Sequence, residues 1–145
     1  MKLFVKVMLA AAIGLYASLV QASAADHKLA VHVDQSDPAA MNLALNNLEN
    51  VEAYYAEKGD SVTIEVVAYG PGLKMYTADS PVRDRISALS LEHPSLVFSA
   101  CGNTLAAMEK KAGTKIALIA ETSMVPSGVV RLMELQEQGY SYVKP

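Results

Sequence analysis

Short runs rich in β-branched residues alternate with helix-start signals along this chain of 145 residues. Such runs favour strands, and strands that alternate with helices form βαβ units, in which the strands run parallel and the helices cover both faces of the sheet. The length has room for one domain. We therefore predict a single-domain α/β fold with a mainly parallel sheet. The predicted strands cover residues 28–33, 61–69, 96–100, 122–125 and 140–143.

Proline and glycine mark the expected ends of the first two helices. Asp37-Pro38 and Asp79-Ser80-Pro81 each join a capping side chain to a proline that has no N–H to satisfy, which is typical of a helix start. They predict a helix from Pro38 that Gly59 closes, and a second helix over 82–91. The side chains expected to face the core are Met41, Leu45, Leu48, Val51 and Tyr55 in the first helix, and Val82, Ile86 and Leu89 in the second.

The second half of the chain leaves one choice open. A third helix is predicted over 104–111, and Pro126-Ser127 begin a last helix that ends at Gly139. Between these two helices the strand is either 116–120 or the shorter 122–125, and we favour the shorter one. The side chains of the last helix expected in the core are Val130, Met133 and Leu135.

The first 24 residues have the three parts of a secretory signal peptide. Lys2 and Lys6 form a basic start, residues 7–20 are uncharged, and Ala22-Ser23-Ala24 supplies the small residues that signal peptidase accepts. The uncharged stretch of 14 residues is shorter than the ~20 that a membrane-spanning helix needs. We therefore predict a signal peptide over 1–24, a mature domain over 25–145, and a periplasmic or secreted protein.

The charge of the mature chain argues against two classes of partner. Loss of Lys2 and Lys6 leaves 10 of the 12 basic residues against all 15 acidic residues, a formal charge of −5. An acidic chain without a basic run has no electrostatic reason to bind nucleic acid or an anionic lipid surface. We therefore expect no nucleic-acid partner, and no membrane association once the signal peptide is removed.

Cys101 is the single cysteine, so its thiol is free, bridged to another molecule or modified. It lies where a predicted strand runs into a predicted helix, and ligands of parallel sheets gather at such carboxyl ends. Unpaired N–H groups and the helix dipole would stabilise a thiolate there, and Gly102 would leave room for donors and for a second molecule. Cys101 is therefore the candidate catalytic residue. The alternative is a packed cysteine that behaves as a small hydrophobic residue.

Other kinds of site find less support in the sequence. His27, His32 and His93 have no short metal-ligand spacing with Cys101, so we predict no metal and no cofactor. His32 is expected to pack in the first strand and His27 to be solvated. His93 is the histidine nearest to Cys101 in sequence, but its surroundings indicate only a loop.

Two loop segments also follow predicted strands. Gly70-Pro71-Gly72 predicts a tight turn and lacks the spacing of a phosphate-binding loop. Its place at a strand's carboxyl end makes Gly70 and Gly72 candidates for the wall of a pocket at Cys101. Asp34 and Ser36 occupy the matching place after the first strand, where capping the following helix is their expected role.

Four segments in this order resemble the DsrE/DsrF-like family, in its exported branch. They are Asn46-Asn47, 67–75 (VAYGPGLKM), 99–104 (SACGNT) and 125–140 (VPSGVVRLMELQEQGY). The likeness extends over nearly the whole mature chain, and several motifs in the right order are more specific than any one alone.

The resemblance implies a five-stranded domain that forms homo-oligomers, commonly trimers or hexamers. In the better understood members a cysteine after a central strand carries sulfur as a persulfide between donor and acceptor proteins, and Cys101 matches it. The expected function is therefore a sulfur carrier or weak sulfurtransferase that uses Cys101, with Gly102, Asn103 and Thr104 as its cradle and proteins or small sulfane-sulfur compounds as donor and acceptor. The exported branch differs in compartment from the relay members. A non-catalytic ligand-binding or assembly module, and a redox sensor that forms an intermolecular disulfide, remain as alternatives.

Overall fold

The computed structural model describes residues 24–145 as one sheet with helices on both faces. All five strands of this sheet pair in parallel, in the order β4-β3-β2-β1-β5, so the predicted α/β class is confirmed. The predicted signal peptide, apart from Ala24, lies outside the described residues. Within residues 24–145, no helix is long and apolar enough to cross a membrane. The strands are β1 (Asp26–Val33), β2 (Ser61–Ala68), β3 (Leu96–Cys101), β4 (Thr122–Val125) and β5 (Ser141–Val143).

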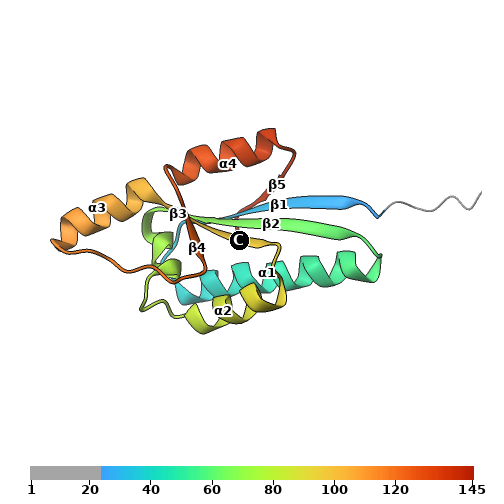
Figure 1. The fold of residues 1–145 in the computed structure, drawn as a ribbon, viewed down its shortest axis with the longest axis horizontal. Helices are drawn as coiled ribbons and strands as arrows, with labels where there is room; N and C mark the ends of the chain where they lie inside the picture. Colours follow the sequence, from blue (N-terminus) through green and yellow to red (C-terminus); the bar gives the residue numbers. More distant parts are fainter. Residues whose placement is uncertain (1–23) are drawn as a thin grey trace, which may run out of the picture.

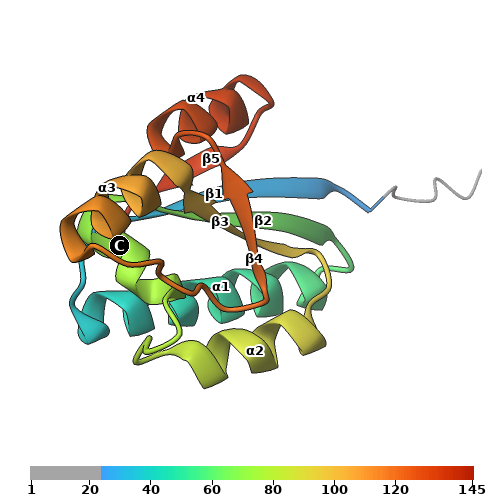
Figure 2. The same cartoon turned by 60° about the vertical axis from the view of Figure 1, so that its left-hand side comes forward.

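The helices form two unequal layers around the sheet. Helices α1 and α2 cover one face of the sheet and α4 covers the other. Helix α3 projects beyond the carboxyl ends of the strands (Figures 1 and 2). The main core lies between the sheet and the α1/α2 layer, and a smaller core of Ala30, Val67, Leu132 and Leu135 lies under α4. The helices are α1 (Pro38–Glu57), the 3-10 helix η1 (Gly70–Tyr76), α2 (Arg83–Glu92), α3 (Gly102–Ala112) and α4 (Gly128–Glu137).

Helix α1 begins where the sequence predicted. The Asp37 carboxylate caps it by accepting a hydrogen bond of 3.0 Å from the Ala39 N–H, and Pro38 occupies the first turn. Met41, Leu45 and Leu48 of the predicted stripe are buried, and Val51 and Tyr55 are partly buried. The shorter of the two alternatives for the fourth strand is also confirmed as β4.

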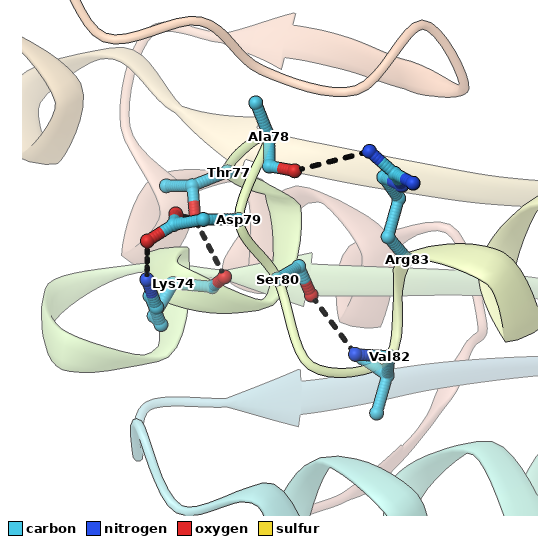
Figure 3. Close-up of polar contacts among 7 residues, drawn as sticks. All are labelled: Lys74, Thr77, Ala78, Asp79, Ser80, Val82 and Arg83. Carbon is cyan, nitrogen blue, oxygen red and sulfur yellow. Dashed lines mark hydrogen bonds and ion pairs between the residues drawn. The ribbon is translucent and has the colours of Figure 1, made fainter.

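The Asp79-Ser80-Pro81 segment does not start its helix in the way that Asp37-Pro38 starts α1. Asp79 does not cap α2, because its carboxylate binds the Lys74 ammonium and accepts a hydrogen bond of 2.7 Å from the Thr77 hydroxyl (Figure 3). Ser80 instead accepts a 3.3 Å hydrogen bond from the Val82 N–H, and the helix begins two residues after Pro81. Val82, Ile86 and Leu89 nevertheless face the core as predicted.

Three further sequence predictions need correction. The Gly70-Pro71-Gly72 segment opens the helix η1 instead of forming only a tight turn. Helix α3 begins at Gly102, two residues before the predicted start. In α4, Leu135 is buried as predicted, but Val130 and Met133 are 48% and 57% exposed, and Leu132 is the second buried side chain.

A buried ion pair attaches α4 to the sheet. Glu65 on β2 is 3% exposed and accepts hydrogen bonds from Arg131 of α4, at 2.8 Å from Nε and 2.7 Å from Nη2. The Ser99 hydroxyl on β3 donates to the same carboxylate at 2.6 Å. A buried carboxylate is tolerated when it is paired in this two-pronged geometry and its remaining lone pairs are satisfied. The α4 layer is therefore held by a charged contact as well as by its small apolar core.

Gly72 lies where η1 passes the end of β1 at close range. A Cβ atom at this position would lie 2.2 Å from the Val33 carbonyl oxygen and 2.8 Å from Asp34 Cα. These are backbone atoms, so the chain itself would have to move. The absence of a side chain at Gly72 thus permits the close approach of the two segments.

We predict that Gly72→Ala lowers the free energy of unfolding by about 3 kcal/mol, at the upper end of the usual cost of overpacking. The matched control is Gly59→Ala, which meets nothing within 4 Å and loses only the preference of glycine for its positive φ, about 1 kcal/mol. Urea unfolding of both variants gives the comparison. Equal losses at the two positions would contradict the close approach.

Candidate functional site

Cys101 is both the last residue of β3 and the N-cap of α3. Its backbone is extended, with φ −73° and ψ 115°, and its sulfur accepts a hydrogen bond from the Thr104 N–H at 3.5 Å. This is the role that a serine or aspartate oxygen usually has at a helix start. The predicted junction of strand and helix at Cys101 is thus confirmed.

The sheet register places a tyrosine beside this cysteine. Ala68 pairs with Ala100 in parallel register, so Tyr69 and Cys101 are the next residues on adjacent strands. Side chains alternate along a strand, and both residues lie on the face of Glu65 and Ser99, which α4 covers. Tyr69 therefore forms one side of the sulfur's surroundings.

The start of α4 approaches the same sulfur from β4. Cys101 pairs with Val125, the last residue of β4, and the chain then turns through Pro126 into α4. The Pro126 carbonyl accepts a hydrogen bond of 3.2 Å from the Asn103 N–H, which joins the starts of α3 and α4. Gly128 packs so closely on Tyr69 that a Cβ atom there would lie 2.8 Å from the ring. Two helix N-termini thus converge on one thiol.

This convergence decides the acidity of the thiol. Burial raises the pKa of Cys101, but the Thr104 hydroxyl and the backbone amides of Gly128, Thr104 and Asn103 act in the opposite direction. Together they hold the pKa of the Cys101 thiol below its ordinary value. Amide donors and helix N-termini favour the anion in this way.

Thr104 links the thiol to the predicted loop residue Gly70. The Gly70 N–H donates to Thr104 Oγ1 at 2.9 Å. Because this oxygen already accepts a hydrogen bond from Gly70, its own proton is free to be donated to the sulfur. Gly70, Asn103 and Thr104 also line a shallow pocket of about 540 Å³ beside the first turns of α3.

The thiol is less accessible than the sequence suggested. Cys101 is 4% exposed in the single chain. Gly102 does not open a path to it, because a Cβ atom at Gly102 would lie 3.2 Å from the Val125 carbonyl oxygen and 3.5 Å from Met124 Cε. The small size of Gly102 serves close packing against β4, and the expected opening beside it is absent from the described residues.

The remaining candidates separate into those near the thiol and those away from it. Gly102, Asn103, Thr104 and Gly70 gather around Cys101, whereas Gly72 packs on the end of β1. Asp34 and Ser36 were expected to cap α1, but Asp37 is the cap, and Asp34 binds Lys144 near the end of the chain.

The histidines do not supply a base for Cys101. His93 precedes β3 and contacts Glu52 at 2.9 Å, at the opposite edge of the sheet from Cys101. His32 is buried as predicted, stacks on the Tyr69 ring at 4.6 Å, and binds the Tyr142 hydroxyl at 2.7 Å. His27 is partly covered, 3.7 Å from the Tyr55 ring, and not freely solvated.

Burial also limits the charge that His32 can carry. It lowers the pKa of His32, although the nearby Asp34 carboxylate acts in the opposite direction. Among residues 24–145, no three His, Cys, Asp or Glu side chains gather in a way that could hold a metal ion.

Sequence reasoning missed Gly128 and Tyr69 as neighbours of the thiol. A signal for Gly128 was present in the sequence. The helix start at Pro126-Ser127 directly follows a predicted strand, and Cys101 also directly follows a predicted strand. Glu65 was a second signal, because a lone carboxylate within an apolar strand indicates a buried partner. That partner, Arg131, could not be identified without the fold.

Comparison with known proteins identifies a relative but no function. No protein-family model matches the sequence, and no curated protein matches it. A solved structure from Methanobacterium thermoautotrophicum, that of the protein of unknown function MTH1491, has 31% sequence identity to this chain and a TM-score of 0.71. The match covers 83% of this chain and 100% of the archaeal one. The chain therefore belongs to the same family as MTH1491.

Proposed function

We propose that this protein is an exported sulfur carrier that binds sulfane sulfur as a persulfide on Cys101. One observation carries the proposal: the starts of α3 and α4 direct hydrogen-bond donors at a single thiol and lower its pKa. Donors placed in this way favour the thiolate before reaction, and the terminal persulfide anion after it. The resemblance to the DsrE/DsrF-like family supports the same chemistry.

The proposed step needs no external oxidant or reductant. The Cys101 thiolate attacks the outer sulfur of thiosulfate, a new S–S bond forms, and the S–S bond of thiosulfate breaks. Sulfite leaves with the electron pair, and the negative charge of the thiolate passes to the terminal sulfur of the persulfide. An acceptor thiolate then attacks that terminal sulfur and restores Cys101.

Burial of the thiol favours small donors and acceptors. With Cys101 4% exposed, a sulfur on the surface of another folded protein would have to enter past α3 and β4. Thiosulfate or a short polysulfide needs far less room. We therefore place small sulfane-sulfur compounds ahead of protein donors.

A non-catalytic module with a packed cysteine is the second candidate. The same 4% exposure favours it, since unreactive cysteines are usually buried. The two candidates differ in whether the native thiol reacts, and at what pH.

Thr104→Val is expected to raise the pKa of Cys101, because it removes the hydroxyl that opposes the effect of burial on the thiol. Below both pKa values, a rise of one pKa unit leaves about tenfold less thiolate. The measurement is the rate of alkylation of native protein by iodoacetamide against pH, with Thr114→Val, exposed just beyond α3, as the matched control. A wild-type thiol that is inert, or that titrates at the usual value, would favour the packed cysteine.

Incubation of the mature protein with thiosulfate or polysulfide is expected to add the mass of one sulfur atom. Cys101→Ser should gain nothing, and a reductant should remove the added mass from the wild type. Intact-protein mass spectrometry reads this directly. An equal gain in Cys101→Ser would place the sulfur elsewhere and defeat the proposal.

The proposal includes assembly of this protein into homo-oligomers. The resemblance to the DsrE/DsrF-like family implies trimers or hexamers. On α4, Val129, Val130 and Met133 are 52%, 48% and 57% exposed. Exposed apolar side chains that gather on one face are typical of an interface between subunits.

A charge in this face should separate the subunits. We expect Met133→Glu to reduce the molecular mass in light scattering to that of a single chain, because a carboxylate would be buried unpaired. Leu91→Glu, at an 84% exposed position at the end of α2, is the matched control and should leave the assembly intact. A wild-type protein that is already monomeric would contradict this part of the proposal.

A further inference from the structure

Helix α4 contributes an amide to the thiol site, yet little apolar contact holds it in place. Its buried side chains are Leu132 and Leu135, which meet Ala30 and Val67 of the sheet. Val129, Val130 and Met133 point away from the sheet. Small apolar cores of this kind fix the position of a helix only loosely.

The Glu65–Arg131 pair supplies the missing constraint near the start of α4. Arg131 lies in the first turn, where its N–H bonds to the Ser127 carbonyl at 3.0 Å. Its guanidinium donates two hydrogen bonds to the Glu65 carboxylate, at 2.8 and 2.7 Å, and the Ser99 hydroxyl on β3 donates to the same carboxylate. The planar fork allows one orientation, so it fixes direction as well as distance.

Position matters there because the next contacts are tight. Gly128 touches the Tyr69 ring, and Pro126 accepts the hydrogen bond from Asn103. Cys101, two residues beyond Ser99 on β3, lies between these contacts. A small tilt of α4 would thus move the Gly128 amide relative to the sulfur.

We propose that Glu65 and Arg131 are positioning residues that hold the start of α4 against Cys101 and thereby set the reactivity of its sulfur. The inference rests on the proposed function, because it concerns the same thiol. Their hydrogen bonds join α4 to the sheet and do not involve the sulfur, so both residues act through the position of the start of α4. Arg131 also binds Glu134 on its own helix at 3.3 Å, and this contact leaves the link to the sheet unaltered.

Two conservative variants separate position from charge. Glu65→Gln keeps the shape of the side chain but removes a negative charge, and Arg131→Lys keeps the charge but loses the fork. If charge alone mattered, Glu65→Gln would lower the pKa of the thiol and Arg131→Lys would leave it unchanged. If position matters, both variants raise it.

The experiment is the pH dependence of iodoacetamide alkylation of Cys101 in the mature protein. We expect both variants to raise the pKa by about half a unit or more, which leaves about threefold less thiolate at low pH. Arg85→Lys is the matched control, since Arg85 binds Asn42, Asn46 and Glu49 on the opposite face of the sheet. It should leave the pKa of the thiol unchanged.

Thermal unfolding of each variant shows whether it is folded. If Glu65→Gln does not fold, Arg131→Lys still tests the inference. A lower melting temperature with an unchanged thiol pKa would mean that the pair is structural only, and would overturn the inference. A lower thiol pKa in Glu65→Gln together with an unchanged thiol pKa in Arg131→Lys would also overturn the inference. An ordinary pKa in the wild type would overturn the proposed function as well, whereas a lowered wild-type pKa that the variants retain would overturn this inference alone.

Discussion

The parallel pairing of β3 with β4 is the constraint on which the site depends. It aligns Cys101 with Val125, so that the chain leaves both strands at one edge of the sheet and enters α3 and α4 side by side. A helix start has free N–H groups and a partial positive charge, and two such starts at one point create a field that favours an anion. Antiparallel pairing would have separated the two helix starts by the length of the strand.

The buried carboxylate of Glu65 shows how such a site is maintained within a small domain. Apolar packing alone would give α4 a poorly defined position on the sheet, since many arrangements of Leu132 and Leu135 bury similar area. A paired charge restricts these alternatives, because any displacement leaves a desolvated group without its partner. The Glu65 carboxylate raises the pKa of the Arg131 guanidinium, as expected of a pair held at this distance.

Local signals in the sequence were sufficient for the order of the elements and for the place of Cys101. Asp37-Pro38 starts α1 because cap and proline act within one turn, and the junction of β3 and α3 is equally local. The Asp79 signal failed because Lys74 and Thr77 compete for the same carboxylate. In α4, Leu135 was predicted correctly, but Val130 and Met133 were not, because apolar periodicity defines a stripe only when one side is known to be covered, and both are as apolar as Leu132.

The rest of the site required the register of the sheet. Glu65 and Arg131 are 66 residues apart, and Tyr69 meets Gly128 only because β2 and β3 pair as they do. No local pattern encodes these meetings.

The burial of Cys101 and the pKa of its thiol together decide how the sulfur can react. Burial alone would keep the thiol protonated and unreactive, and exposure alone would leave a persulfide open to oxidation and to any passing thiol. Hydrogen-bond donors placed around a buried sulfur lower its pKa without exposing it. Fixed dipoles can replace water as the partners of an anion at little cost in reorganisation, because they are already oriented. The proposed function therefore requires a compact sulfur compound as donor, and the packing around Cys101 would then protect the sulfur that it carries.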